Sequence, residues 1–134
     1  MDISKLLENK AKEFPNKPAL IFKDQPLTFS GLKDTSFQLA NSLINLGIRK
    51  CDKVAIYLPN LPEYIYSYLA IWSIGATAVP LDFMLTEDEL ASCISHSETK
   101  ILITKSKPNI SLVALKEKCP GLEEIILCHE KKTF

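Results

Sequence analysis

The residues of this chain that could bind a phosphate group are few and widely separated. A phosphate-binding loop needs several backbone N–H groups at close range, which closely spaced glycines permit. The 134 residues include only four glycines, and no two of them fall within the length of one such loop. Neither a dinucleotide fingerprint nor a P-loop can be written into this sequence. We therefore expect no nucleotide binding by this chain alone and no cofactor-binding residue within it.

Charged residues exclude other classes of ligand. Sixteen basic and sixteen acidic residues cancel, so no net field attracts nucleic acid or an anionic membrane. Arg49 is the only arginine, which leaves the chain almost without the planar guanidinium that binds phosphate or carboxylate in a bidentate way. Lys105 and Lys107 are expected to be solvated surface residues.

The cysteines and histidines do not form a recognisable metal site. Four cysteines lie far apart without a C-x-x-C pair, and two histidines do not complete a zinc-binding set. They are Cys51, Cys93, Cys119 and Cys128, with His96 and His129. We expect no metal, and reduced, buried thiols in a cytoplasmic protein.

A stretch without charge, residues 64–81, raises the question of a membrane span. Gly75 and Pro80 interrupt it, and its helical part is too short to cross a bilayer. The charged N-terminus does not resemble a signal peptide. We expect a buried helix followed by a buried strand, and no transmembrane segment.

Four side chains are candidates for a binding role. Tyr64, Tyr68 and Trp72 recur every four residues and so share one face of a helix. They could form an acyl-chain wall or a self-association patch, although aromatic residues at this spacing usually pack in a core. Asp82 follows a strand at its carboxyl end, where α/β sheets place ligands, and could shape a substrate entrance. Its alternative role is to close a turn.

Apolar periodicity and caps predict alternating helices and strands. The expected helices span residues 3–14, 28 or 30–47, 61–74 and 112–118, and a further helix starts at the Thr86 box and ends near His96. The expected strands span residues 19–22, 26–29, 54–58, 77–81, 101–104 and 124–128. Asn60 with Glu63, and Thr86 with Glu89, have the spacing of a capping box. The pattern predicts an α/β fold: a partial doubly wound, mainly parallel sheet with helices on both faces, preceded by an N-terminal helix and a short hairpin.

A collinear set of short motifs covers nearly the whole chain. The set comprises Lys17-Pro18-Ala19-Leu20, Leu27-Thr28-Phe29, Leu46-Gly47-Ile48, Asp52-Lys53-Val54-Ala55-Ile56, Pro59-Asn60, Glu63, Gly75-Ala76, Pro80-Leu81-Asp82, Thr86 and Glu89-Leu90. In order and spacing they resemble the opening of the AMP-forming acyl-CoA synthetases, or adenylate-forming ligases. The resemblance implies that residues 1–134 are the first segment of that family's large domain, with no second domain present.

The resemblance also implies a parent reaction. A carboxylic acid, by expectation a fatty acid, reacts with ATP to give an acyl-adenylate and pyrophosphate, and coenzyme A then displaces AMP. ATP, Mg and CoA are thus implied for the full-length parent, and the remainder of that ligase is the implied partner. The family's Ser/Thr/Gly-rich loop ending in Lys matches no residue of this chain. The resemblance therefore implies no catalytic residue here, and we expect the segment alone to be inactive.

Two positions depart from the family pattern. Gly31 stands where the helix-start box usually has Glu, so that cap loses its reciprocal partner. Cys51 stands where a turn glycine is usual, so the backbone there must avoid a left-handed conformation or carry strain.

Other interpretations remain open at this point. The chain can be a self-standing α/β interaction module that forms a homodimer through apolar surface, without catalysis. Within the family, the parent can instead be an adenylation domain or an aryl-CoA ligase. The sequence does not fix the acyl substrate, its chain length, the thiol acceptor or the oligomeric state.

Overall fold

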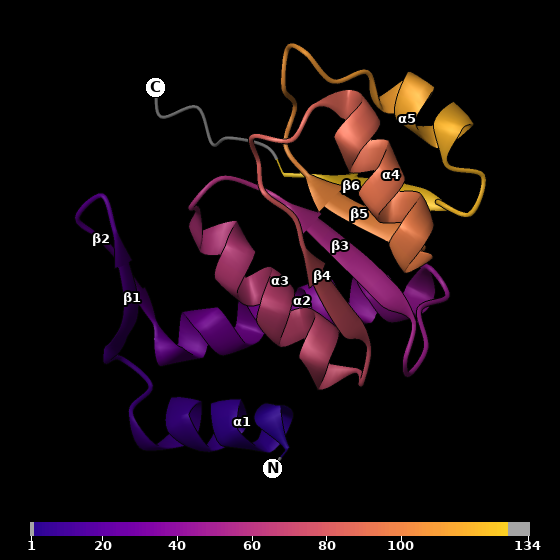
Figure 1. Cartoon of the computed structure of the whole chain (residues 1–134). Coiled ribbons are helices and arrows are strands. Elements are labelled where there is room, and N and C mark those ends of the chain that lie inside the picture. Colours follow the sequence, from indigo (N-terminus) through magenta and orange to yellow (C-terminus); the bar gives the residue numbers. More distant parts are fainter. Residues whose placement is uncertain (1, 129–134) are drawn as a thin grey trace. The chain divides into compact units, whose positions relative to one another are not determined.

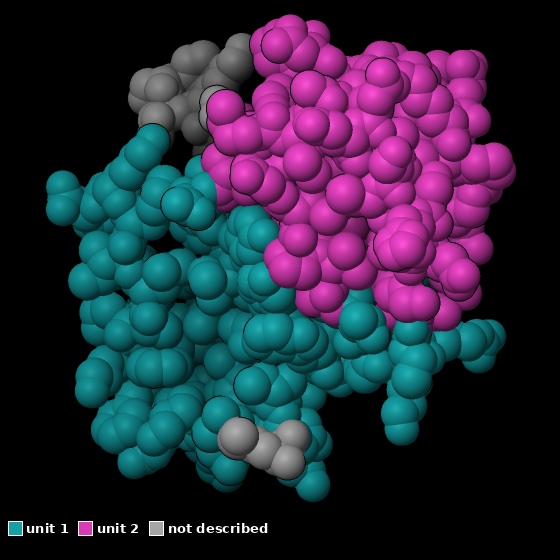
Figure 2. All heavy atoms as spheres, in the orientation of Figure 1, with its two compact units in different colours: residues 1–51, 60–77 teal, residues 52–59, 78–134 magenta. Residues whose placement is uncertain are grey.

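The computed structural model describes residues 2–128 and alternates helices with strands (Figure 1). The elements are α1 (Ile3–Glu13), β1 (Pro18–Phe22), β2 (Gln25–Thr28), α2 (Phe29–Asn45), β3 (Lys53–Tyr57), α3 (Pro62–Ser73), β4 (Thr77–Pro80), α4 (Glu87–Ser97), β5 (Ile101–Thr104), α5 (Leu112–Lys118) and β6 (Glu124–Leu127). The chain divides into two compact units (Figure 2). Unit 1 is residues 1–51 and 60–77, and unit 2 is residues 52–59 and 78–134.

Unit 1 is built on three helices and a hairpin. Asp2 caps α1 by accepting a hydrogen bond from the Ser4 N–H at 3.0 Å, as the sequence predicted. Helix α2 packs against α3, and α1 packs against both. The β1–β2 hairpin is antiparallel, and its two turn residues, Lys23 and Asp24, have φ of 48° and 61°. Two consecutive positive φ values suit the right-handed twist of a two-residue hairpin turn.

The two departures from the family motif are Gly31, in the first turn of α2, and Cys51, in the loop between α2 and β3. Thr28 still caps α2 by accepting from the Gly31 N–H at 3.1 Å, although Gly31 has no side chain with which to reach back. Gly47 ends the helix with φ +93°, the left-handed terminator that the sequence predicts. Cys51 has φ +70°, so of the two alternatives at this position the strained, left-handed one is realised.

The predicted cap of α3 is wrong. The helix begins at Pro62 with Leu61 as its N-cap, and no side chain caps it. Proline favours the first helical position because its φ is preset and its missing N–H would have no helical partner. The residue before a proline is pushed to extended backbone, which is how Leu61 lies. Asn60 is therefore one residue too early to cap.

Unit 2 contains a four-stranded parallel sheet in the order β4-β3-β5-β6. Val54 lies beside Ile101 in the β3–β5 pair, and Ile101 lies beside Glu124 in the β5–β6 pair. Each of these strands, and α5, was predicted to within one residue at either end. The α/β class, the parallel sheet, the N-terminal helix and the hairpin are all confirmed.

The two central strands of the sheet, β3 and β5, are buried on both faces. On one face α4 and α5 pack against the strands, and the buried residues of this core are Ala55, Tyr57, Leu90, Ala91, Ile94, Leu102, Leu115, Cys119 and Leu122. The strand residues of opposite parity, Val54, Ile56, Ile101 and Ile103, are at most 1% exposed. Strands that are buried on both faces read as continuous apolar runs, and residues 101–104 are such a run.

Candidate functional site

The three aromatic residues singled out in the sequence form one row along α3. The Tyr64 and Tyr68 ring centroids are 5.3 Å apart, and those of Tyr68 and Trp72 are 4.7 Å apart, both with tilted planes. Such offset aromatic contacts stabilise each other beyond their burial. The structure thus brings these three candidates together in unit 1.

Helix α3 is buried along only part of its circumference. Ser67, Ala70 and Ile71 are its buried residues, whereas Trp72 is 46% exposed and Ile65 is 41% exposed. The prediction that this helix is covered on several sides is therefore wrong for these two residues among the described part of the chain. A role in an acyl-chain wall or in self-association stays a prediction.

Asp82 lies in unit 2, in the loop after β4. One carboxylate oxygen accepts a hydrogen bond from the Met84 N–H at 2.9 Å, and the Asp82 carbonyl accepts from the Leu85 N–H at 3.1 Å. This is the turn-closing role that the sequence offered as one alternative. A part in a substrate entrance stays a prediction.

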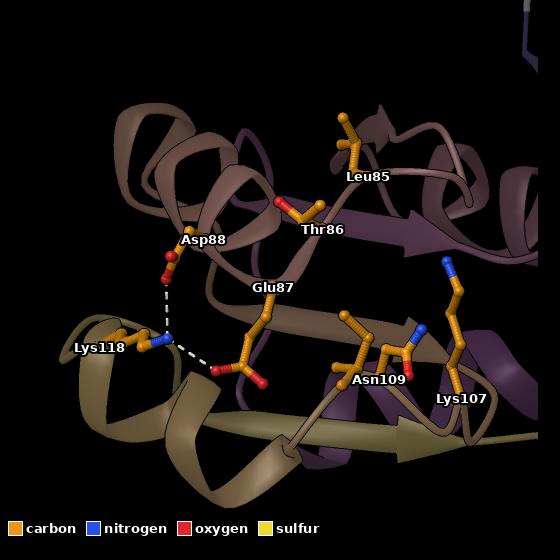
Figure 3. Close-up of a pocket in the computed structure, with 8 residues that line it drawn as sticks. Leu85, Thr86, Glu87, Asp88, Lys107, Asn109 and Lys118 are labelled. Atoms are coloured by element: carbon orange, nitrogen blue, oxygen red, sulfur yellow. Dashed lines mark hydrogen bonds and ion pairs between the residues drawn. The ribbon is translucent and has the colours of Figure 1, made fainter.

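A groove of about 400 Å³ lies beside the start of α4 (Figure 3). Its lining comes from the β4–α4 loop, the first turn of α4, the β5–α5 loop and the end of α5: Leu85, Thr86, Glu87, Asp88, Lys107, Asn109, Ile110 and Lys118. The sequence pattern did not indicate this groove, because its walls are up to 33 residues apart along the chain.

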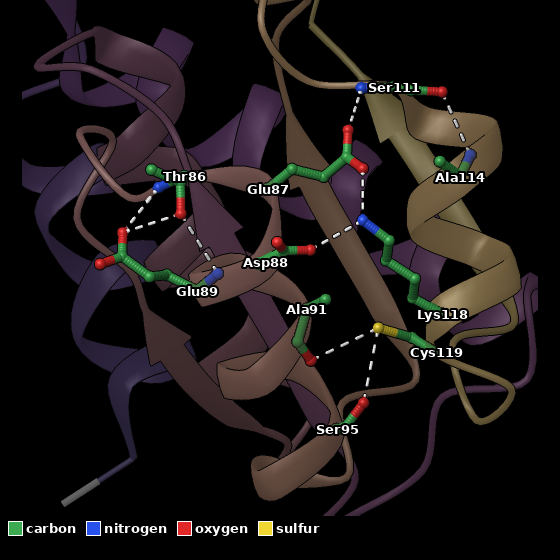
Figure 4. Close-up of polar contacts among 10 residues, drawn as sticks. All are labelled: Thr86, Glu87, Asp88, Glu89, Ala91, Ser95, Ser111, Ala114, Lys118 and Cys119. Atoms are coloured by element: carbon green, nitrogen blue, oxygen red, sulfur yellow. Dashed lines mark hydrogen bonds and ion pairs between the residues drawn. The ribbon is translucent and has the colours of Figure 1, made fainter.

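Lys118 forms ion pairs with the two acidic residues that line this groove, Glu87 and Asp88. Its Nζ lies 2.7 Å from Glu87 Oε1 and 2.8 Å from Asp88 Oδ1, and the Ser111 N–H donates to Glu87 Oε2 at 2.7 Å (Figure 4). The hydrogen bond from Lys118, followed by that from Ser111, holds the pKa of Glu87 below its usual 4.5. The same ammonium lowers the pKa of Asp88, and the two carboxylates raise the pKa of Lys118.

This groove does not fit a nucleotide phosphate. Its Lys118 ammonium already contacts two carboxylates, and these negative charges would repel a phosphate. Among residues 2–128, no group of three or more His, Cys, Asp or Glu side chains could hold a metal ion.

A second polar cluster lies at the carboxyl ends of β3 and β5. The fully buried Tyr57 donates from its hydroxyl to the Leu85 carbonyl at 2.7 Å, and the Thr104 hydroxyl donates to the Tyr57 carbonyl at 2.9 Å. Lys107 Nζ donates to the Tyr57 hydroxyl at 3.1 Å and to the Phe83 carbonyl.

The same Lys107 ammonium lies 4.7 Å from the centroid of the Phe83 ring and 5.4 Å from that of Tyr57. Its positive charge is therefore attracted to two aromatic faces as well as to two oxygen acceptors. The prediction that Lys107 is a solvated surface residue is wrong, and nothing in the local sequence indicated these contacts.

None of the four cysteines forms a disulfide, and only one of them is buried. Cys119 packs between α4 and α5, where its Sγ donates to the Ala91 carbonyl at 3.4 Å and accepts from the Ser95 hydroxyl at 3.5 Å (Figure 4). Cys51 is exposed, and Cys93 and Cys128 are intermediate, which corrects the expectation of uniformly buried thiols. Within residues 2–128 no helix has the length and apolar character needed to cross a bilayer.

Comparison with known proteins connects this scaffold to a class of enzymes. The chain is 30% identical over 124 residues to 4-hydroxybutyrate–CoA ligase 2 of Metallosphaera sedula, which covers 92% of the chain and 22% of that protein. It is 37% identical over 109 residues to oxalate–CoA ligase of Arabidopsis thaliana, which covers 80% of the chain and 21% of that protein. The chain spans about a fifth of the length of these curated relatives.

The solved structures agree with the sequence relatives. The crystal structure of the anthranilate CoA ligase AuaEII in complex with anthranoyl-AMP superposes with a TM-score of 0.86 at 25% identity, covering 96% of this chain and 25% of that one. Fold and sequence thus match one segment of the adenylate-forming ligases. The model of the AMP-binding enzyme family matches residues 7–133, and the chain belongs to that family. The resemblance read from the sequence is confirmed.

Proposed function

We propose that this chain is the first part of the large domain of an AMP-forming CoA ligase and that it is catalytically inactive by itself. The observation that carries the proposal is that the family model covers nearly all of this chain, while the chain covers only a small part of its relatives. The family model matches residues 7–133, yet the chain spans about a fifth of its curated relatives. The lack of closely spaced glycines and of a metal-binding cluster among the described residues supports the second half of the proposal.

The parent reaction that we propose has two steps. A carboxylate oxygen attacks the α-phosphorus of ATP and releases pyrophosphate, and the thiol of coenzyme A then attacks the acyl carbon and releases AMP. ATP with Mg supplies the leaving groups and the charge stabilisation when bound to the full-length protein. The remainder of the ligase is the partner of this segment. The contribution of the segment itself is structural: capped helices and a buried parallel sheet.

For the acyl substrate of the full-length ligase we propose a class of acids rather than one compound. A fatty acid is the expectation from overall similarity. The relatives named above carry 4-hydroxybutyrate, oxalate and anthranilate in their names, so an aryl-CoA ligase stays an alternative, as does an adenylation domain. A cytoplasmic location belongs to the proposal and is supported by four thiols without a disulfide.

ATP–pyrophosphate exchange tests the inactivity of the segment. The purified 134-residue chain is assayed with Mg, ATP and a panel containing octanoate, 4-hydroxybutyrate, oxalate and anthranilate, with a full-length AMP-forming ligase as positive control. We expect exchange no faster than in buffer for every acid. Exchange above buffer that depends on one acid, and that follows the chain through a sizing column, would contradict the proposal.

A self-standing interaction module without catalysis is the second candidate. It is favoured by the exposure of Trp72 and Ile65 on α3. The size of the native gene product distinguishes the two candidates. An antibody raised against the chain should detect a protein several times larger than 15.0 kDa if the segment belongs to a ligase, and one of about that mass if it is a module.

A further inference from the structure

The loop between β4 and α4, residues 81–86, is tied to strand β3 at both of its ends. At its start the Leu81 N–H donates to the Ile56 carbonyl at 2.9 Å. Near its end the Leu85 carbonyl accepts from the Tyr57 hydroxyl at 2.7 Å. Tyr57 is fully buried, and a side chain packed on all sides has little freedom to move. The two ends of the loop are thus fixed to a rigid part of unit 2.

The middle of the loop, by contrast, lies near the surface. Met84 is 80% exposed, and Phe83 is only partly buried. The Met84 N–H donates to the Asp82 side chain, and the Leu85 N–H donates to the Asp82 carbonyl. These two hydrogen bonds form a turn within the loop, so they shape the loop without attaching it to the sheet.

Lys107 attaches this middle part to β3. It lies in the β5–α5 loop, 24 residues from Phe83 and 50 residues from Tyr57 in the sequence. Its Nζ donates to the Phe83 carbonyl and to the Tyr57 hydroxyl, and it lies 4.7 Å from the centroid of the Phe83 ring. The ring centroids of Tyr57 and Phe83 are 4.9 Å apart. One ammonium thus joins both the backbone and the ring of Phe83 to a side chain of the core.

These contacts depend on the positive charge of Lys107. A charged donor forms stronger hydrogen bonds than a neutral one, and a cation is attracted to the faces of aromatic rings. The acidic residues that line the groove, Glu87 and Asp88, pair with Lys118 instead. Lys107 lies at the other end of the groove from Lys118 (Figure 3). The charge of Lys107 is therefore directed at the β4–α4 loop.

We propose that the β4–α4 loop is a strap, and that Lys107 is the latch that holds this strap against the carboxyl ends of β3 and β5. Loss of the charge at Lys107 releases the middle of the strap, while the sheet and α4 keep their structure. Leu85 and Thr86 line the groove beside α4, so release of the strap also changes one wall of that groove. The inference concerns unit 2 alone and holds whether the chain is a ligase segment or a self-standing module.

Amide hydrogen exchange of the chain, followed by NMR, measures the release of the strap. Lys107→Met keeps an apolar side chain against the two rings but removes the charge and the N–H donors. It should speed the exchange of the Met84 and Leu85 amides about tenfold, the effect of losing a charge-assisted hydrogen bond. The amide of Ile94, inside α4, should exchange at its original rate because the fold is kept.

Two further variants separate a latch from a general loss of stability. Lys116 Nζ also donates to a backbone carbonyl, that of Glu123 at 2.9 Å, but outside the strap. Lys116→Met should therefore leave the strap amides unchanged. Lys107→Arg keeps the charge and the donors, so its strap amides should exchange at rates closer to those of the unmodified chain than to those of Lys107→Met. Unchanged strap exchange in Lys107→Met, equal acceleration at Ile94, or equal acceleration in Lys107→Arg would overturn the proposal.

Reductive methylation of the unmodified chain tests the latch even where Lys107→Met does not fold. The Lys107 amine donates to two oxygens and contacts two rings, whereas Lys116 is exposed. Lys107 should therefore react with formaldehyde and borohydride several times more slowly than Lys116, as measured by mass spectrometry of the peptides. Equal rates at the two lysines would show that the latch does not exist in solution.

Discussion

Lys118 Nζ lies 2.7 Å from Glu87 Oε1, which joins the last turn of α5 to the first turn of α4 across 31 residues of chain. The short helix α5, seven residues long, has little stability of its own. Its end is held by this ion pair, and its start by the hydrogen bond from the Ser111 N–H to the other oxygen of Glu87. One carboxylate thus fixes both ends of α5.

The first prediction is that this pairing makes stability depend on pH. The pKa values of Glu87 and Asp88 lie below their usual 4.5 and 3.8 in the folded chain. Their contribution is therefore present above those usual values and is lost as the pH falls through the lowered ones. Glu87→Gln should lower the melting temperature at neutral pH and have no effect below the lowered pKa of Glu87. Thermal melts between about pH 7 and pH 2 measure this.

Asp88→Asn is the matched control for that prediction. The Asp88 side chain is 88% exposed, whereas that of Glu87 is 21% exposed, so solvent screens the Asp88 contact more strongly. Asp88→Asn should change the melting temperature less than Glu87→Gln. An equal loss from both variants, or a Glu87→Gln effect that persists in strong acid, would show that charge pairing is not the cause.

The second prediction concerns the start of α4. Thr86 accepts from the Glu89 N–H at 3.4 Å, and Glu89 accepts from the Thr86 N–H at 2.8 Å, which completes a capping box. Thr86→Ala should lower the free energy of unfolding by about 1 kcal/mol in urea denaturation. Ser92→Ala, at an exposed position within the same helix, should leave it unchanged or slightly higher. If the Thr86→Ala variant is as stable as the unmodified chain, the capping box does not contribute to stability.

The third prediction uses two buried serines with opposite environments. Among the described residues Ser36 Oγ has no hydrogen-bond partner, whereas Ser67 Oγ donates to the Glu63 carbonyl at 2.5 Å. Ser36→Ala removes an unsatisfied hydroxyl and should raise the free energy of unfolding by about 0.5–1 kcal/mol. Ser67→Ala should raise it less or lower it. Destabilisation by Ser36→Ala would indicate that its hydroxyl is bonded in solution.

The fourth prediction concerns the two left-handed residues that flank the loop after α2. Cys51 has φ +70° with a side chain, and Gly47 has φ +93° with open space around it. Cys51→Gly should stabilise the chain by about 1 kcal/mol because it relieves backbone strain. Gly47→Ala should destabilise it by about the same amount for the converse reason. Urea denaturation of both variants measures the pair, and the same sign for both would contradict the strain argument.

Local patterns explain what could be predicted from the sequence. The Thr86–Glu89 box and the Gly47 terminator depend on residues within one turn of each other, so spacing alone located them. The same reasoning failed at Asn60, because the backbone restriction from Pro62 outweighed a favourable capping residue.

Contacts between distant parts of the chain could not be predicted in this way. Lys107 meets Tyr57 across 50 residues, and Lys118 meets Glu87 across 31. Periodicity also identified the aromatic face of α3 without revealing which face would pack. For that reason the exposure of Trp72 was missed, although its row with Tyr64 and Tyr68 was found.

The central claim is that this segment is ligase scaffold without a nucleotide site of its own, and a titration with MgATP tests it most directly. Amide spectra of the ¹⁵N-labelled chain are recorded up to about 5 mM MgATP, which covers affinities weaker than those of ordinary nucleotide sites. The account predicts that the resonances do not shift in a saturable way. Saturable shifts, above all at Lys107, Asn109 or Lys118 in the groove beside α4, would contradict it.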